Sequence, residues 1–307
     1  MGAGSTPHLA KGIDTKKLLR TAISEDQRAS YEADVGAYLE DLLADFNNRD
    51  PEKVNRHLKE IESALSSEIA GFVSLRFGGS VKRHTYVDGL SDIDTLAIID
   101  NSELVDKSPA EVLQYFETRI KEHFPNTPVT AGSLAVTIEF SDGYKIQVLP
   151  ALTTATGNRI ASSDGTEWSN VIKPDKFAEK LTAVNQSNNG GVVPVIKLYK
   201  AINSKLPEDA KLQSYHIESI AVNAFENYDG PRDRKSMLLH LTEFASKAVL
   251  HPIKDSTGQS LRVDDKMGNS GSLERQRASV AIQRVAVRMK LADSEASVQR
   301  WKDLMEE

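Results

Sequence analysis

The sequence predicts an α+β fold, with a mixed sheet and flanking helices in the first half of the chain and a helical domain in the second. Short apolar segments of strand character fall between residues 73 and 149. Two of them, LAVTIEF (134–140) and KIQVL (145–149), are joined by Ser-Asp-Gly, which is typical of a β-hairpin. From Pro174 onward, apolar residues recur mostly at helical spacing.

The first half begins with two expected helices, at 25–46 and 51–70, of which the second has Pro51 in its first turn behind Asp50 as a cap. Strands are expected at 73–77 and 94–99, a helix at 109–124, and a long polar loop at 151–170.

The second half is expected to be helical around one polar loop at 251–271. The expected helices are 175–184, 192–203, 215–227, 232–250 and 273–291. The change of pattern near residue 173 divides the chain into two domains, 1–172 and 173–307.

Composition excludes several classes of protein. The chain has 307 residues, of which 39% are hydrophobic and 27% charged, as in a globular protein. A net charge of −6 argues against a main function in coating nucleic acid, because that affinity comes from Lys and Arg on phosphates. The absence of Cys excludes disulfides and thiol catalysis. No apolar run approaches the ~20 residues that span a bilayer, so we expect a cytoplasmic protein without a membrane partner.

The stretch FGGSVKRHTYVDGLSDID (77–94) carries the strongest chemical signal. On a strand, Asp92 and Asp94 point to the same face while Ile93 points into the core. Two carboxylates this close repel each other unless a cation lies between them. Hard cations such as Mg²⁺ bind through one or two carboxylates plus substrate phosphates.

The Gly-Gly-Ser turn before these carboxylates suits an anion. Gly79 lets the backbone approach a ligand closely, and the N–H groups of such a turn form an anion-binding concavity. The hydroxyl of Ser80 can donate to a phosphate oxygen. Together, the turn and the paired aspartates predict a site for a metal-bound nucleoside triphosphate.

With this motif the sequence resembles the DNA polymerase β-like nucleotidyltransferases, and within them the bacterial cGAS/DncV-like enzymes (CD-NTases, SMODS type). The resemblance implies a polymerase β-like core and a C-terminal helical domain like that of oligoadenylate synthetases. It implies Mg²⁺- or Mn²⁺-dependent condensation of nucleoside triphosphates, ATP and also GTP or pyrimidine nucleotides, into a cyclic or short linear second messenger. It further implies antiphage (CBASS-like) defence, with regulatory or effector proteins encoded nearby.

Three further segments extend the resemblance. KIQVLPA (145–151) is similar to the strand of the third catalytic carboxylate, which places Gln147 at that position. VIKLYKAIN (195–203) is similar to the helix whose Lys contacts the triphosphate, which implies Lys200, with Lys197 one turn away. QSYHIESI (213–220) implies a triphosphate contact by Ser214.

Gln147 departs from the family pattern, because an amide neither offsets a metal's charge nor accepts a proton. Three interpretations follow: Gln147 is a weak ligand, Glu139 on the neighbouring hairpin strand substitutes for it, or the chain is a nucleotide-binding pseudoenzyme. A nucleotidyltransferase that modifies RNA or protein is a further alternative.

Overall fold

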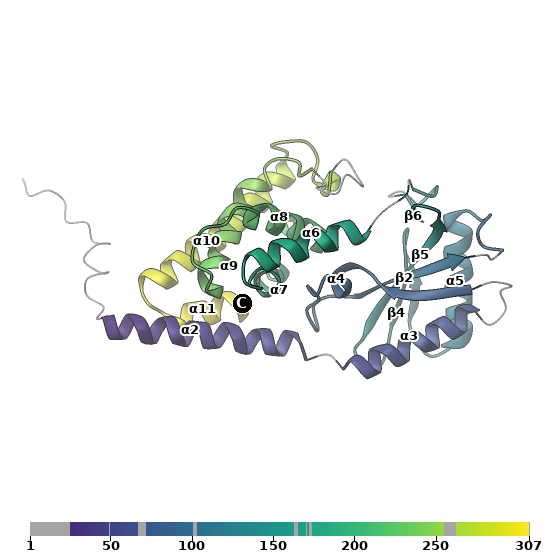
Figure 1. The fold of residues 1–307 in the computed structure, drawn as a ribbon, viewed down its shortest axis with the longest axis horizontal. Coiled ribbons are helices and arrows are strands. Elements are labelled where there is room, and N and C mark those ends of the chain that lie inside the picture. The colour runs from purple at the N-terminus through teal and green to yellow at the C-terminus, as the bar shows by residue number, and fades with distance from the viewer. Residues whose placement is uncertain are drawn as a thin grey trace, which may run out of the picture.

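The computed structural model describes residues 25–48, 50–66, 72–100, 103–162, 165–169, 171, 174–254 and 262–306. Figure 1 shows a sheet with helices packed on it in one half of the molecule and a group of helices in the other. The short helix α4 lies where the two halves meet (Figure 1).

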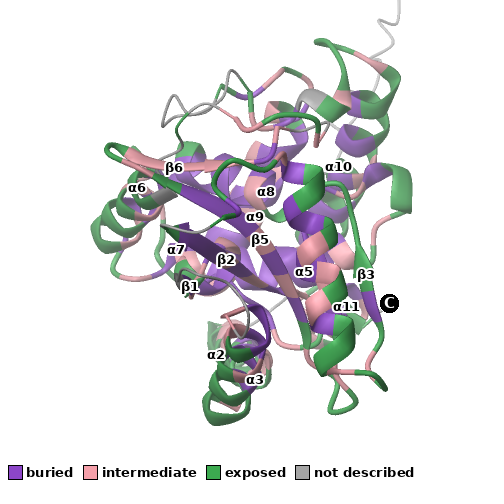
Figure 2. Ribbon diagram, turned by 90° about the vertical axis from the view of Figure 1, so that its right-hand side faces the viewer, coloured by how far each residue is buried: buried purple, intermediate pink, exposed green. Residues whose placement is uncertain are grey.

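A mixed sheet forms the first half, as predicted. Its strands are β1 (Phe72–Phe77), β2 (Ile93–Asp100), β3 (Val129–Ala131), β4 (Val136–Glu139), β5 (Lys145–Thr154) and β6 (Gly157–Ile160). The order is β1-β2-β5-β4-β3, and β6 also pairs with β5. Strands β2 and β5 are parallel, and the other pairs are antiparallel. The two central strands are largely buried (Figure 2).

Three helices accompany the sheet: α3 (Pro51–Ser66), α4 (Gly79–Lys82) and α5 (Pro109–His123). Helix α5 begins with a capping box in which Ser108 and Glu111 satisfy each other's backbone N–H groups. Helix α3 is tied to the β4–β5 turn, because the His57 ring lies 2.9 Å from an Asp142 carboxylate oxygen and stacks on Phe140.

The helical half is built from seven helices of the described chain. They are α2 (Glu25–Phe46), α6 (Pro174–Ser187), α7 (Val192–Ser204), α8 (Ser214–Phe225), α9 (Arg234–Ala248), α10 (Leu273–Ser294) and α11 (Val298–Glu306). Two short 3₁₀ turns, η1 (Glu208–Ala210) and η2 (Asp265–Met267), lie between them. Among the described residues, no helix combines the length and the apolar character that crossing a membrane requires.

Two hydrophobic cores divide the molecule. One joins α3, α5 and the sheet, and the other joins α2 to the helices that follow residue 174. Helix α2 therefore packs with the helical half, although it precedes the sheet in the sequence and was grouped with the 1–172 domain. The predicted division between residues 172 and 173 falls on positions outside the described residues.

Most predicted elements are confirmed to within a few residues, and α2 matches at both ends. The predicted loop at 151–170 is wrong in part, because β5 runs on to Thr154 and turns back as β6. The prediction also omitted β3 and α11. Helix α3 is described only to Ser66, so the expected end at 70 lies outside the described residues.

Helix α2 is held by a buried hydrogen bond that a matched pair of variants can test. The indole N–H of Trp301 donates to the Tyr31 hydroxyl at 2.8 Å, whereas the buried Tyr38 hydroxyl has no hydrogen-bond partner among the described residues. We expect Tyr31→Phe to lower the free energy of unfolding by about 1–3 kcal/mol, because the indole N–H is left unsatisfied.

Tyr38→Phe on the same helix is the control, and we expect it to leave stability unchanged or slightly higher. Urea unfolding measures both variants. Equal losses in the two would contradict a specific contribution from the Trp301 hydrogen bond.

Candidate functional site

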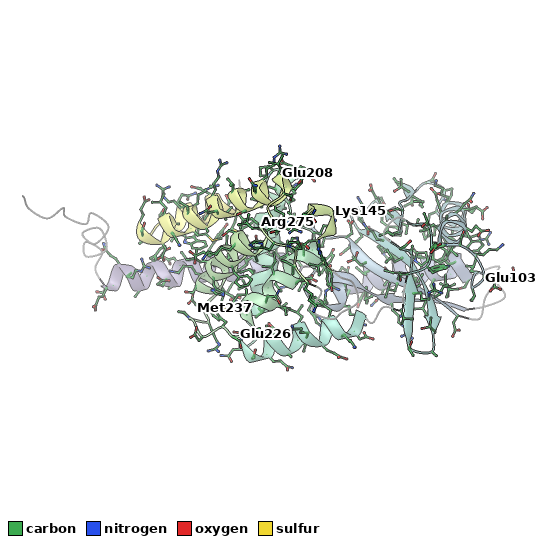
Figure 3. The ribbon with its side chains drawn as sticks, turned by 90° about the horizontal axis from the view of Figure 1, so that it is seen from above. Glu103, Lys145, Glu208, Glu226, Met237 and Arg275 are labelled. Atoms are coloured by element: carbon green, nitrogen blue, oxygen red, sulfur yellow. The ribbon has the colours of Figure 1, made fainter. Side chains whose placement is uncertain are left out.

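The strand arrangement brings the two parts of the predicted motif to one edge of the sheet. Strand β1 is antiparallel to β2 and β5 is parallel to it, so the end of β1 lies beside the starts of β2 and β5. The Gly78–Ser80 turn follows β1, Asp92 directly precedes β2, and Lys145 opens β5. Figure 3 shows Lys145 at the sheet edge that faces the helical half.

The Asp94 carboxylate is packed against the glycine turn. Gly79 has φ +44°, and a Cβ there would lie 1.7 Å from Oδ2 of Asp94. The Ser80 N–H donates to the same oxygen at 3.3 Å, and the Gly78 N–H donates to the Asp94 carbonyl at 2.9 Å. Glycine is required here because any side chain would occupy the space of the carboxylate.

The electrostatics of the two aspartates fit a cation. Burial raises the pKa of Asp94, and the neighbouring charge of Asp92 raises it further, against the effect of the Ser80 N–H and of Arg83. Two carboxylates that disfavour each other's ionisation are stabilised by a bound divalent ion. The described residues hold no group of three or more His, Asp or Glu arranged for a metal.

The structure places Gln147, which the resemblance put at the third carboxylate position, beside both aspartates. It is the partner of Asp94 in the β2–β5 register, and its amide Nε2 donates to Oδ2 of Asp92 at 2.6 Å. In this arrangement the amide turns its N–H₂, not its carbonyl, toward the carboxylate. Gln147 therefore acts on Asp92 as a neutral hydrogen-bond donor.

Glu139 is occupied elsewhere. It pairs with Lys145 across the β4–β5 hairpin, with 2.9 Å between Oε1 and Nζ, and its side chain is about half exposed. The hydrogen bond to Glu139 and the charge of Asp92 both raise the pKa of Lys145, so both carboxylates stabilise its ammonium. The geometry gives no support to Glu139 as a substitute for the third carboxylate.

Lys200 lies in a buried charge cluster behind the turn. Its Nζ donates to Oε1 of Glu218 at 2.9 Å and to the Thr85 carbonyl at 3.0 Å. Glu218 is fully buried and also accepts from Nε of Arg83 at 2.5 Å and from the Thr85 hydroxyl. The Thr85 N–H donates to the Ser80 carbonyl at 2.9 Å, so hydrogen bonds connect the cluster to the turn.

The cluster holds Glu218 ionised. Burial alone would raise the pKa of Glu218, but the charges of Lys200 and Arg83 and the hydroxyl of Thr85 outweigh it and leave that pKa below its ordinary value. Burial lowers the pKa of Lys200, which the charge of Glu218 partly opposes. Two neighbouring cations favour the charged form of a carboxylate, because each of them stabilises its negative charge.

The structure does not bring Lys197 to the aspartates. Its Nζ donates to Oδ1 of Asn47 on the loop after α2, and it lines a cavity of about 420 Å³ with His84 and Tyr86. Asp92, Asp94 and Ser80 are not among the residues that line this cavity.

Ser214 is the exposed first residue of α8, and Gln213 holds the N-cap position without a side-chain cap bond. The residue after Ser214 is Tyr215, whose ring packs on Phe177 and lies beside Arg83 of the cluster. The Arg83 guanidinium lies 5.8 Å from the Tyr215 ring centroid.

Glu218 and Thr85 were absent from the predicted site. The segment HIESIAV (216–222) contains one carboxylate among buried neighbours, and a carboxylate in such a helix requires a charged partner. That signal was available in the sequence. The sequence did not reveal which cations would pair with Glu218.

Neutralising Glu218 tests the cluster. We expect Glu218→Gln to lower the free energy of unfolding by about 3–5 kcal/mol, because Lys200 is then buried without a counter-charge. The pKa of Glu218 is lowered in the folded state, so its contribution to stability is present above its ordinary value of 4.5 and is lost as the pH falls through the folded pKa. The variant should lack this part of the acid sensitivity.

Urea unfolding between pH 7 and acid pH measures both effects. Glu226→Gln is the control, because Glu226 is exposed at the end of the same helix. An unchanged acid dependence in Glu218→Gln would contradict the assignment.

Comparison with known proteins assigns part of the chain to a domain family. The Second Messenger Oligonucleotide or Dinucleotide Synthetase (SMODS) domain profile matches residues 34–185. No protein in the curated set of sequences matches the chain significantly.

Solved CD-NTase structures share the fold at low sequence identity. CdnC of Escherichia coli MS115-1, solved with ATP, has a TM-score of 0.63 at 18% identity over 90% of this chain and 98% of its own. CdnG of Bradyrhizobium diazoefficiens, in complex with GTP, has a TM-score of 0.66 at 15% identity over 89% and 99%. The DncV cyclic AMP-GMP synthase of Vibrio cholerae has a TM-score of 0.62 at 11% identity over 95% and 88%.

These likenesses confirm a polymerase β-like core followed by a helical region. The domain match assigns residues 34–185 to the SMODS family of nucleotidyltransferase domains, and the chain shares its fold with the CD-NTases.

Proposed function

We propose that the protein condenses nucleoside triphosphates into a short cyclic or linear oligonucleotide second messenger, using Mg²⁺ or Mn²⁺. The observation that carries this proposal is the Gly79–Ser80 turn packed against Asp94, with Asp92 beside it. One structural unit thus offers anion-binding N–H groups and metal-binding carboxylates at a single edge of the sheet. The family description, synthesis of oligonucleotide or dinucleotide messengers, supports the same reaction.

The residues have distinct roles in this proposal. Asp92 and Asp94 hold the divalent cation together with triphosphate oxygens, and Gly79 and Ser80 donate to the phosphates. A bound cation would lower the pKa of the attacking hydroxyl and neutralise charge on the leaving pyrophosphate. Lys200 supplies positive charge behind the turn, while its ammonium stays paired with Glu218.

Ser214 is a further candidate phosphate donor, because it is exposed at the start of α8, where helix N–H groups favour an anion. For Lys197 the geometry gives no support, since its ammonium contacts Asn47 and lines a separate cavity.

The position of Gln147 supports one cation more strongly than two. Asp92 and Asp94 together balance one divalent charge, and the amide of Gln147 adds none while it holds Asp92 by a hydrogen bond. The same hydrogen bond favours a second candidate function, a pseudoenzyme that binds nucleotides and regulates a partner. We rank synthesis first because the turn and both aspartates are present.

The wider setting rests on the family. We propose a cytoplasmic enzyme of antiphage (CBASS-like) defence, with ATP and GTP or pyrimidine nucleotides as substrates and effector or regulatory proteins as partners. Structures of CdnC with ATP and CdnG with GTP support the choice of substrates. The nucleotides would lie between the 1–172 and 173–307 domains, beside the edge that carries Asp92.

Product formation tests the proposal. Incubation with all four nucleoside triphosphates and Mg²⁺ or Mn²⁺ should yield a phosphatase-resistant oligonucleotide, identified by mass spectrometry. Asp92→Asn with Asp94→Asn should abolish it, because the metal ligands lose their charge. Asp100→Asn should not, since Asp100 is exposed at the far end of the same strand. Tight nucleotide binding without product in either metal would replace synthesis by the pseudoenzyme function.

Substitution of Gln147 tests the metal site. Gln147→Asp should raise activity or shift the preference from Mn²⁺ toward Mg²⁺, because a third carboxylate can hold a second cation. Gln147→Leu removes the hydrogen bond to Asp92 at similar volume, and we expect Mn²⁺ affinity to fall about 10- to 100-fold. Titration of Mn²⁺ by electron paramagnetic resonance measures affinity and stoichiometry. If neither variant changed metal binding, Gln147 would lie outside the metal shell.

A further inference from the structure

Helix α10 has apolar residues on both of its faces, which is unusual for a helix at the molecular surface. Its inner face packs into the helical core through residues that include Ala278, Ile282 and Met289. Its outer face exposes four large apolar side chains that the core does not use. They are Leu273, Val280, Val287 and Leu291, each between 41% and 66% exposed.

The outer apolar residues form one row. Leu273, Val280 and Val287 are spaced by seven residues, and Leu291 follows four residues later, so at about 100° per residue they fall on one face. The row covers 18 residue steps, or about 27 Å at 1.5 Å per residue. The described chain has seven exposed large hydrophobic residues, and these four are the majority of them.

Three arginines run along the same face. Arg277 and Arg284 each follow a member of the row by four residues, and Arg288 lies four residues beyond Arg284; all three are exposed. Arg277 contacts Asp209 at 3.1 Å, but both side chains are more than half exposed, so the pair adds little stability. A chain with net charge −6 thus presents a local basic stripe among apolar side chains. We call these seven residues the α10 stripe.

A hollow lies beside the first half of the stripe. It measures about 570 Å³ and lies between α10 and the segment around η1, with Pro207, Leu273, Val280 and Arg284 among its lining residues. Figure 1 shows α10 on the side of the helical half away from the sheet. Figure 3 shows Glu208 of η1 at the outer rim of the helical half. The surface therefore combines a groove, a row of apolar side chains and positive charge.

We propose that the α10 stripe binds an amphipathic helix of a partner protein that carries a row of large apolar side chains flanked by carboxylates. An apolar row of this length suits helix-in-groove recognition, in which anchors recur every three to four residues. The arginines favour an acidic partner and fix how its helix is aligned along α10.

Charge disfavours the other occupants. A second copy of this chain would bring the arginines of two stripes together, and like charges across an interface cost affinity. Nucleic acid would leave the four apolar residues without partners, because its contacts are mainly to phosphates. This surface is separate from Asp92 and Asp94, so failure of the proposal would leave the proposed catalytic function intact.

Binding of a synthetic peptide tests the proposal. The probe is a 21-residue helical peptide with Leu at every seventh residue and Glu at the positions that flank this row on the helix surface. Its binding is measured by fluorescence anisotropy. A peptide of identical composition in scrambled order should not bind. Val280→Asp with Val287→Asp should weaken binding at least about tenfold, while Val105→Asp, an exposed residue of the sheet half, should have no effect.

Charge reversal provides the second arm. Arg277→Glu, Arg284→Glu and Arg288→Glu together should abolish binding of the acidic peptide and create binding of its Lys-substituted counterpart. Urea unfolding should give wild-type stability for these variants, because the residues are exposed.

Four outcomes would overturn the proposal. The first two are equal binding of the scrambled peptide and absence of binding by the acidic one. The third is concentration-dependent dimerisation that the stripe variants abolish, which would assign the surface to a second copy. The fourth is displacement of the peptide by a single-stranded oligonucleotide, which would assign it to nucleic acid.

Discussion

The fully buried carboxylate of Glu218 joins the two halves of the molecule. It belongs to α8 in the helical half, it pairs with Lys200 of α7, and it accepts from Arg83 and Thr85, which follow the glycine turn of the sheet half. None of these groups can be removed singly without leaving a charge or a polar group unsatisfied in the interior. The position of the turn, and hence of Asp94, therefore depends on an interaction with helices distant in the sequence.

Backbone geometry at the glycine turn fixes the position of the Asp94 carboxylate. The space of a missing Cβ at Gly79 is filled by the Asp94 carboxylate, and the adjacent N–H of Ser80 donates to it. Gln147 orders the second carboxylate by a hydrogen bond without contributing charge. The candidate site is thus preorganised around two carboxylates, and a bound cation would offset the repulsion between them.

The sequence predicted the helices, strands and turns that short stretches of residues determine. Short apolar segments and turn residues predicted β2 and the β4–β5 hairpin, and helical spacing of apolar residues predicted most helices. The spacing of Gly79, Ser80, Asp92 and Asp94 predicted the candidate site. The β5–β6 hairpin was missed although its pairing is local, because the Thr-rich segment after Pro150 resembles a polar loop. The resemblance implied a triphosphate contact for Lys200, and the sequence did not show that Glu218, 18 residues later, holds its ammonium. The packing of α2 on helices that follow residue 174 is a long-range contact that local pattern does not reveal.

The packing of α2 has a consequence for how the chain acquires its structure. The partners of Tyr31 are Ala292 and Trp301, more than 260 residues later in the sequence. During synthesis, residues 25–46 emerge early and expose an apolar face long before α7, α9 and α11, which pack on it, exist. The sheet half has its own core and can fold meanwhile, so the last step of folding is expected to be closure of the helical half around its earliest helix.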